Sequence, residues 1–288
     1  MKTFSSISFQ FFFVLILLCA ASSAQAGKVT DNTRTRFQFA TLINEEWKDV
    51  FVDSCTSDWK EKWFLDGKKA TIAHSKKGMD FAAGMKWGDD SCHAVLWTKK
   101  SFSGDIRIDF EYTRLDDEIR GVTILYILAT GSGAGPYKKD ISRWSDRRAV
   151  PSMKLYFLNM NTYHISYAAF GTKNKKPDED YIRARRYLPR LKRLRGSELT
   201  PNYNRTGLFK KGVPHQITVI KKGRQLFMHI RTPDKEMLCH FKADRFPPIT
   251  EGRIGLRHMY TRSARYSNFR ISVLNEAAKK EKNVPSKP

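Results

Sequence analysis

Apolar and polar residues alternate along much of the middle of this chain. The segment GDIRIDFEYTRL, residues 104–115, places apolar side chains at every second position: Ile106, Ile108, Phe110 and Tyr112. A period of two predicts a strand with one buried face. The segment GVTILYILA, residues 121–129, is almost continuously apolar, which is typical of a strand buried on both faces.

Further segments carry similar signals and are also predicted to form strands. They are SMKLYFLNM (152–160), YHISYAAF (163–170), HQITVIKKGRQLFMHI (215–230), GRIGLRHMY (252–260) and YSNFRISV (266–273). Lys222, Gly223 and Arg224 predict the turn of a hairpin. Only residues 181–195 show a pattern that a helix could adopt, and Pro189 interrupts it. Many short strands separated by turn signals predict an all-β fold, a two-sheet antiparallel β-sandwich.

The N-terminus has the pattern of an export signal. Lys2 precedes the apolar run FFFVLILLCA, and Ala24 and Ala26 stand where a signal peptidase requires small residues. We therefore predict a signal peptide over residues 1–26 and a secreted or periplasmic protein. No second long apolar run follows, so we expect no membrane span after signal removal, although an uncleaved run could still act as an anchor.

The rest of the chain is predicted to form a single β-sandwich domain over residues 27–275, a length within the range of one such domain. The last segment, EAAKKEKNVPSKP, covers residues 276–288 and is polar and interrupted by prolines. This composition predicts a disordered basic tail.

The charge balance is strongly basic, with 52 Lys and Arg against 29 Asp and Glu and a formal net charge of +23. Removing the signal peptide takes away only Lys2, which leaves +22. Such an excess concentrates polyanions around the protein. For an exported protein these are acidic or sulfated polysaccharides before nucleic acid, so we expect an acidic polysaccharide as partner and no nucleic acid. The alternative is that a basic habitat sets the charge and no partner is implied.

The cysteines of the mature chain are Cys55, Cys92 and Cys239, an odd number. In an oxidising compartment Cys55 and Cys92 could pair, which would leave Cys239 buried and free. No cysteine or histidine spacing is typical of a zinc site, and we expect no cofactor. A structural calcium ion would be compatible with the fold, but the sequence identifies no ligands for it.

Several motifs together resemble one family. They are FEYTR with GVTILYI, PSMKLYFLNMNTYHISYAAF, YIRARRY, TGLF with GVPHQITV, and EGRIGLRHMYTRSARYSNFRI. This combination resembles the YesU-like family, whose fold is similar to that of the concanavalin A-like lectins and glucanases. The resemblance implies a concanavalin A-like jelly roll with a sugar-holding sheet, and it implies little about a reaction. The closing pattern GRIGLR and YSNFRI is also similar to the 3-keto-glycoside hydrolase domains, which implies that Arg257 faces the groove, with His258, Tyr260 and Arg262 close by.

Arginines combined with histidines and tyrosines suit a polysaccharide lyase. Such an enzyme neutralises a uronate carboxylate, removes the proton from C5 and returns a proton to the leaving oxygen. The residues considered for catalysis are His164, Tyr167, Arg257, His258 and Tyr260, and those considered for substrate binding are Arg183, Arg185, Tyr187, Trp144, Tyr126 and Arg262. Alternation places His164 and Tyr167 on opposite strand faces, and likewise Arg257 and His258.

Two other functions remain open. A glycoside hydrolase could use Asp109 and Glu111, which share one face of a strand, although ion pairing with Arg107 and Arg114 is the simpler role for them. A non-catalytic carbohydrate-binding module would use aromatic stacking and arginine forks. Trp144 lies among charged residues in an expected loop, so we expect it to be exposed.

The segment YIRARRYLPRLKRLRGSEL, residues 181–199, concentrates arginine and lysine directly after Asp178, Glu179 and Asp180. We predict that it forms a long basic loop beside the sugar-binding groove, with its arginines on the anionic groups of the polysaccharide. The glycine-rich segment at residues 129–137 lacks the features of a phosphate loop and is predicted to form a rim of the groove.

Overall fold

The computed structural model describes residues 32–275, and the chain divides into two compact units at Glu45 and Glu46. In the first unit, residues 32–43 are helical. The second unit contains the strands. The predicted signal peptide and the predicted tail lie outside the described residues. Within those residues, no helix combines the length and the apolar character needed to cross a membrane.

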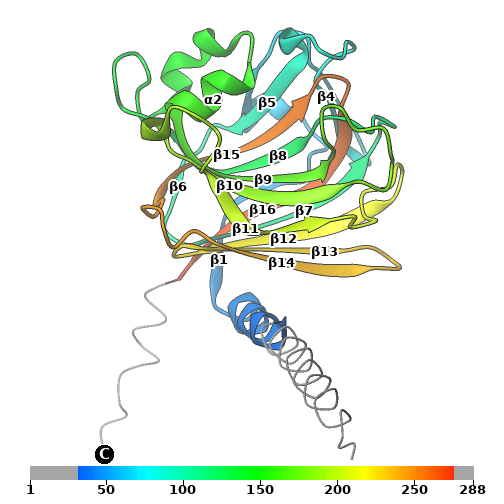
Figure 1. The fold of residues 1–288 in the computed structure, drawn as a ribbon, viewed down its shortest axis with the longest axis vertical. Helices are drawn as coiled ribbons and strands as arrows, with labels where there is room; N and C mark the ends of the chain where they lie inside the picture. The colour runs from blue at the N-terminus through cyan, green and yellow to red at the C-terminus, as the bar shows by residue number, and fades with distance from the viewer. Residues whose placement is uncertain (1–31, 276–288) are drawn as a thin grey trace, which may run out of the picture. The chain divides into compact units, whose positions relative to one another are not determined.

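Sixteen strands run through the described part of the second unit (Figure 1). They are β1 (Trp47–Asp53), β2 (Trp63–Asp66), β3 (Thr71–Ser75), β4 (Gly78–Ala82), β5 (His93–Thr98), β6 (Phe102–Ser103), β7 (Ile106–Arg114), β8 (Thr123–Gly131), β9 (Met160–Ala169), β10 (Tyr181–Tyr187), β11 (Glu198–Asn204), β12 (Pro214–Lys222), β13 (Gln225–Arg231), β14 (Glu236–Lys242), β15 (Glu251–Met259) and β16 (Ser263–Leu274). One α-helix, α2 (Met153–Asn159), and four 3-10 helices, η1 (Trp59–Glu61), η2 (Asp90–Cys92), η3 (Ile141–Arg148) and η4 (Pro189–Leu191), connect them.

The strands form two antiparallel sheets. The first sheet has the order β14-β13-β12-β7-β16-β4-β3, with β1 beside β16, and the second has the order β2-β5-β15-β8-β9-β10-β11, with β6 beside β15. The two sheets join where Thr200 of β11 pairs with Lys242 of β14. The predicted all-β, two-sheet antiparallel sandwich is therefore confirmed.

Strand alternation fills the space between the sheets. In β7 every second side chain is buried, beginning with Ile106 and ending with Arg114. Leu125, Ile165 and Leu256 of the second sheet belong to the same core as Ile108 and Phe110 of the first. The hairpin of β12 and β13 turns at Gly223, whose φ of 55° suits glycine. The predictions for these strands and for this turn are confirmed.

The outer face of the second sheet is covered in part by residues 141–159, which we call the cover. It consists of η3 and α2 with the residues between them. Ile141, Trp144 and Tyr156 of the cover pack against Val95, Trp97, Ile124 and Tyr126 of the sheet in a second apolar cluster. Because a core lies on each side of it, β8 is buried on both faces, as its apolar run predicted.

The prediction of a strand over residues 152–160 is wrong, because most of this segment is α2. Its residues include Met, Lys and Leu, which favour helix. Tyr156 packs one side of the short helix against the sheet. A helix of seven residues, about two turns, contains too few apolar residues to be distinguished from a strand by periodicity.

The prediction of a long basic loop over residues 181–199 is also wrong in its first part. Tyr181–Tyr187 forms β10, which lies between β9 and β11. Ile182 and Ala184 point into the core, while Arg183 and Arg185 point outward. Asp180 is buried and accepts hydrogen bonds from the backbone of Thr206 and Gly207, so it fixes a neighbouring loop.

The three cysteines within residues 32–275, Cys55, Cys92 and Cys239, are buried and free, so the Cys55–Cys92 pairing considered from the sequence does not form in this structure. Cys239 is buried, as predicted. Burial, with Asp53 nearby, raises the pKa of the Cys55 thiol to about 12. A thiol of this kind is a poor nucleophile and metal ligand, so Cys55 has a packing role.

Candidate functional site

The strand register brings six of the predicted site residues onto the outer face of the second sheet. Arg257, Ile124, Ser166 and Arg183 are successive neighbours across β15, β8, β9 and β10 and form one row. Gly255, Tyr126, His164 and Arg185 form the next row across the same strands. Tyr187 lies one strand step farther along β10 on the same face.

Arg257 is completely buried beneath the cover. Its Nη2 donates to the carbonyl oxygen of Pro151 at 2.6 Å and to His93 Nδ1 at 2.7 Å, and its guanidinium lies 4.6 Å from the centre of the Tyr156 ring. Burial, followed by the charge of Arg257, lowers the pKa of His93 to about 3. His93 is therefore neutral and able to accept this bond. Nε and Nη1 of Arg257 and the hydroxyl of Tyr126 are buried without a protein partner.

His164 is the centre of a short hydrogen-bonded chain. Its Nδ1 lies 2.6 Å from the hydroxyl of Tyr187, and its Nε2 lies 2.6 Å from Oγ of Ser166. Burial lowers the pKa of His164 well below its usual value, and Arg185 adds to the effect. Burial also raises the pKa of Tyr187 well above its usual value. At neutral pH the site thus holds a neutral imidazole and a protonated phenol.

The cover is held to the sheet by one carboxylate. Oδ2 of Asp66 accepts from Arg148 Nε at 2.5 Å, from the hydroxyl of Tyr156 at 2.7 Å and from Trp97 Nε1 at 2.7 Å. Both members of the Asp66–Arg148 ion pair are fully buried. Burial raises the pKa of Asp66, and the Arg148 guanidinium is the strongest opposing influence. The Asp66 carboxylate ties both parts of the cover to the sheet, because Arg148 is in η3 and Tyr156 is in α2.

Trp144 lies in the cover and only 3% of it is exposed, so the prediction of an exposed tryptophan is wrong. Its Nε1 donates to the carbonyl oxygen of Lys138 at 3.0 Å, and the Arg148 guanidinium lies 4.2 Å from its ring centre. A loop rich in charge still buries its one large apolar side chain when a sheet lies beneath it.

Tyr126 is fully buried as well, in a cluster of three nearly parallel rings with Trp97 and Tyr156. Its ring centre lies 5.3 Å from that of Trp97 and 5.9 Å from that of Tyr156, at interplanar angles of 16° and 7°. With the cover in place, Tyr126 does not present a face to a sugar.

Gly255 makes this stack possible. A Cβ atom at this position would lie 2.4 Å from Cζ3 of Trp97. We expect Gly255→Ala to lower the free energy of unfolding by about 1–3 kcal/mol, because the ring must leave its position in a closely packed layer. Urea unfolding followed by tryptophan fluorescence measures the change. Gly171→Ala is the control, because its backbone also lies outside the left-handed region and the nearest atom would lie 3.9 Å from the added Cβ.

Part of the outer face remains accessible at the side of β10 and at one end of the sheet. Tyr181 and Arg183 are partly exposed, and the Arg183 guanidinium lies 4.5 Å from the Tyr181 ring centre. Nε of Arg183 has no protein partner. Arg185 is more enclosed and donates from Nη1 to Glu198 at 2.6 Å.

A second partly exposed group includes Tyr260 and two residues that sequence reasoning missed, Trp87 and Arg120. The ring centres of Trp87 and Tyr260 are 4.5 Å apart, and the Arg120 guanidinium lies 4.2 Å from the Trp87 ring centre. Gly121 allows Trp87 to approach the start of β8. In the sequence, Trp87 lies among charged and polar residues, a pattern that indicates an exposed side chain. The same pattern led to the wrong prediction for Trp144.

Tyr167, His258 and Arg262 do not join this site. Tyr167 lies between the sheets with its hydroxyl 3.2 Å from that of Tyr266, and Nε2 of His258 lies 2.8 Å from the same hydroxyl. Arg262 is buried and donates to Asp116 at 3.2 Å. The predicted alternation is confirmed, since His164 and Arg257 face outward while Tyr167 and His258 face the core.

Asp109 and Glu111 lie on the outer side of β7 in the first sheet, so they are not near His164 or Arg257 in the sheet order. Asp109 accepts from Arg107 Nε at 2.7 Å, as the ion-pair interpretation expected, whereas Arg114 pairs with Asp116 at 2.9 Å. Within residues 32–275 no group of three or more His, Cys, Asp or Glu side chains is placed to hold a metal ion.

Comparison with known proteins places this geometry in a lectin-like fold. A Bacillus subtilis protein with a galectin-like fold is 19% identical, with a TM-score of 0.58 over 80% of this chain and 100% of that one. A legume lectin-like domain from Entamoeba histolytica is 9% identical, with a TM-score of 0.52 over 79% of this chain and 99% of that one. Basic winged bean lectin, solved with Tn-antigen, is 8% identical, with a TM-score of 0.50 over 78% and 98% of the two chains.

Identities this low show the fold alone, and they confirm the predicted lectin-like jelly roll. No curated protein matches the chain. The YesU-like name stays a prediction. The family comparison covers nearly the whole sandwich, from residue 48 to residue 271. On that match, this chain belongs to the family described as domain of unknown function DUF1961.

Proposed function

We propose that this protein is exported and binds an acidic polysaccharide along β10, on the outer face of the second sheet. The observation that carries the proposal is the outward pair Arg183 and Arg185 in the middle of a strand that is flanked on both sides by exposed lysines or arginines. The two flanking connections hold Lys173, Lys175 and Lys176 at one end and Arg190, Lys192, Arg193 and Arg195 at the other. Asp178, Glu179 and Asp180 balance the lysines on the first side, whereas residues 188–197 on the other side contain no acidic residue. We call the nine lysines and arginines named here the basic band.

The basic band has the length and charge to hold several units of a polymer. Seven residues of strand extend over roughly 23 Å, and the connections lengthen the band at both ends. In the described part of the chain, no ion pair involves Arg190, Lys192, Arg193 or Arg195. Exposed cations without acidic partners favour polyanions, and the guanidinium fork matches a carboxylate or a sulfate.

Aromatic side chains beside the basic band suit sugar rings. Tyr181 is partly exposed next to Arg183, and Trp87 and Tyr260 are partly exposed at the same end of the sheet. Such side chains offer an apolar face for stacking and, in tyrosine, a polar edge for hydrogen bonds. Arginine and aromatic groups together therefore support an acidic carbohydrate over other polyanions.

β-Elimination is a second candidate function, favoured by the neutral imidazole of His164. A neutral histidine bonded to Ser166 and Tyr187 at 2.6 Å could accept the C5 proton of a uronate, while Arg183 neutralises the carboxylate and Tyr187 supplies a proton to the leaving oxygen. The cover encloses His164, only 3% of which is exposed. For that reason we place binding first and elimination second.

The test is retention of the mature protein on immobilised alginate, glucuronan, ulvan and chondroitin sulfate, with ultraviolet absorbance of the soluble polymers followed in parallel. We expect retention at low salt on at least one polymer and release as salt rises, because ionic contacts are screened. The double variant Arg193→Ala, Arg195→Ala is expected to weaken binding about tenfold or more. Arg270→Ala combined with Lys242→Ala removes the same charge from the other sheet and serves as the control.

Equal losses in the two double variants would mean that net charge alone causes retention, and no retention of the wild-type protein on any polymer would overturn the proposal. Absorbance that rises with the wild-type protein and stays flat with His164→Ala would establish elimination. A flat trace with intact retention would leave the protein a binding module.

A further inference from the structure

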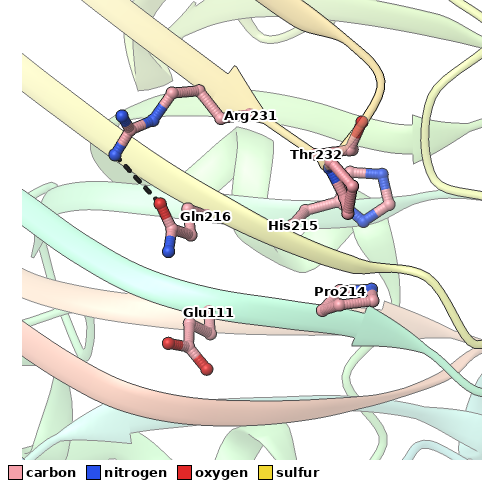
Figure 2. A pocket seen from close by; sticks show the side chains of 7 residues that line it. Glu111, Pro214, His215, Gln216, Arg231 and Thr232 are labelled. Atoms are coloured by element: carbon pink, nitrogen blue, oxygen red, sulfur yellow. Dashed lines mark hydrogen bonds between the residues drawn. The ribbon is translucent and has the colours of Figure 1, made fainter.

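A crevice of about 430 Å³ opens on the first sheet, which does not carry the basic band. It is lined by Glu111 of β7, by Pro214, His215 and Gln216 of β12, and by Arg231 and Thr232 at the end of β13 (Figure 2). A second crevice of about 250 Å³ shares His215 and Thr232 and continues past Lys210 and Lys235. The larger volume is within the range of small-ligand sites, and the two together form an elongated depression.

Strand pairing holds the polar groups of the crevice in one row. Glu111 lies opposite Gln216, and Gln216 lies opposite Arg231. Nη2 of Arg231 donates to Oε1 of Gln216 at 2.9 Å, the bond drawn in Figure 2. Because neighbouring strands are separated by about 4.8 Å, these groups lie close enough together to contact a single ligand.

Glu111 is an oriented carboxylate with acceptor capacity to spare. Oε2 accepts from Ser267 Oγ at 2.9 Å and Oε1 accepts from Asn268 Nδ2 at 3.1 Å. Both donors are neutral, and a carboxylate has about four lone-pair positions. Asp109, two residues earlier, differs because two bonds from Arg107 and one from Thr218 occupy it. Glu111 is therefore able to accept from two vicinal hydroxyl groups of a ligand.

The rest of the crevice is apolar or fixed. Pro214 and Pro233 present ring faces that lack an N–H donor. His215 is buried behind them, where Nδ1 donates to the Val213 carbonyl at 2.8 Å and Nε2 accepts from the Phe209 backbone N–H at 2.8 Å. Burial lowers the pKa of His215, so the ring stays neutral and holds the wall between the two crevices.

From these observations we propose that the paired crevices form a second binding site, which takes an uncharged oligosaccharide. Glu111 balances Arg231 in the larger crevice, and Asp234 balances one of the two lysines, Lys210 and Lys235, in the smaller one. The paired crevices therefore carry far less excess charge than the basic band and have little to attract a polyanion. An oriented carboxylate, an amide and a hydroxyl supply hydrogen bonds to sugar hydroxyl groups, and the proline rings supply contact for the C–H face of the sugar. The protein would then hold two polysaccharides of different charge on its two sheets.

The test is calorimetric titration of the full mature protein with cellohexaose, xylohexaose, mannohexaose and laminarihexaose. We expect saturable binding of at least one of them and little change in affinity between low and high salt, since the hexaoses carry no charge for salt to screen. Glu111→Ala is expected to weaken that binding about tenfold or more, because a hydrogen-bonded charged group is lost. Glu111→Gln keeps the shape of the side chain and removes its charge. It replaces Glu111→Ala in the test if the alanine variant folds poorly.

Two variants distinguish binding in the paired crevices from binding elsewhere on the protein. Asp109→Ala, on the same strand face, and Arg183→Ala, in the basic band, should both keep the affinity for the uncharged hexaose. No saturable binding of any of the four hexaoses would overturn the proposal. The proposal would also be overturned if Glu111→Ala and Glu111→Gln left the binding intact, or if Arg183→Ala abolished it. Either result would leave the acidic polysaccharide proposal standing.

Discussion

Replacing Asp66 with alanine is expected to lower the free energy of unfolding by about 3–5 kcal/mol, because it leaves the fully buried Arg148 guanidinium without its partner. The indole N–H of Trp97 and the hydroxyl of Tyr156 lose their acceptor in the same substitution. Chemical denaturation at neutral pH, followed by circular dichroism, measures the change.

The matched control for this prediction is Asp109→Ala. Asp109 also pairs with an arginine at 2.7 Å, but both side chains are about one quarter exposed, so the loss should stay below about 1 kcal/mol. The double variant Asp66→Ala, Arg148→Met removes the unpaired charge and should recover part of the stability. If Asp66→Ala and Asp109→Ala destabilise the protein equally, Asp66 does not anchor the cover.

Acidification from pH 7 to pH 5 is expected to destabilise the protein by roughly 4 kcal/mol through two buried histidines. Burial lowers the pKa of both His93 and His258 to about 3, whereas an unfolded chain has a histidine pKa of about 6.5. The unfolded state therefore takes up protons first. The stability is fully present above about pH 6.5 and is lost as the pH falls toward 3, at about 2 kcal/mol for each histidine by pH 5.

Urea unfolding at pH 7 and pH 5 tests this expectation, with His258→Gln and His93→Gln as the variants. Each substitution removes one titrating group, so each should reduce the loss between the two pH values by about 2 kcal/mol. His164 and His215 act in the same direction, since burial also lowers their pKa values. Equal stability of the wild-type protein at both pH values would contradict the prediction.

Hydrogen bonds and stacking explain why His258 tolerates burial. Its ring lies 4.6 Å from that of Phe81 in a stacked arrangement, and Nε2 lies 2.8 Å from the hydroxyl of Tyr266. The residue looks catalytic in the sequence because it follows Arg257. In the structure it is a core histidine, and the difference is only which face of β15 it occupies.

The interior of the sandwich could be predicted well from the sequence. The alternation of β7, the continuous apolar run of β8 and the turn at Gly223 were all interpreted correctly, since each pattern reflects contacts within a strand or a hairpin. The same rule assigned His164 and Arg257 to one face of their strands. These inferences need only the period of two, which is a property of the backbone.

The candidate site depended on contacts between distant parts of the chain. Asp66 and Arg148 are 82 residues apart, and Arg257 and Pro151 are 106 residues apart, yet these two contacts hold the cover on the sheet. The cover is what buries Trp144, Tyr126 and Arg257.

By itself, the sequence determined that the chain alternates as an antiparallel sandwich and which residues share a strand face. Only the tertiary structure decided that Tyr181–Tyr187 is an inner strand, that Met153–Asn159 is a helix, and that one face of β15 lies beneath a cover. The physical reason is that periodicity encodes the direction of a side chain relative to its own backbone. What lies in that direction, whether solvent, a second sheet or a helix from another segment, depends on long-range packing.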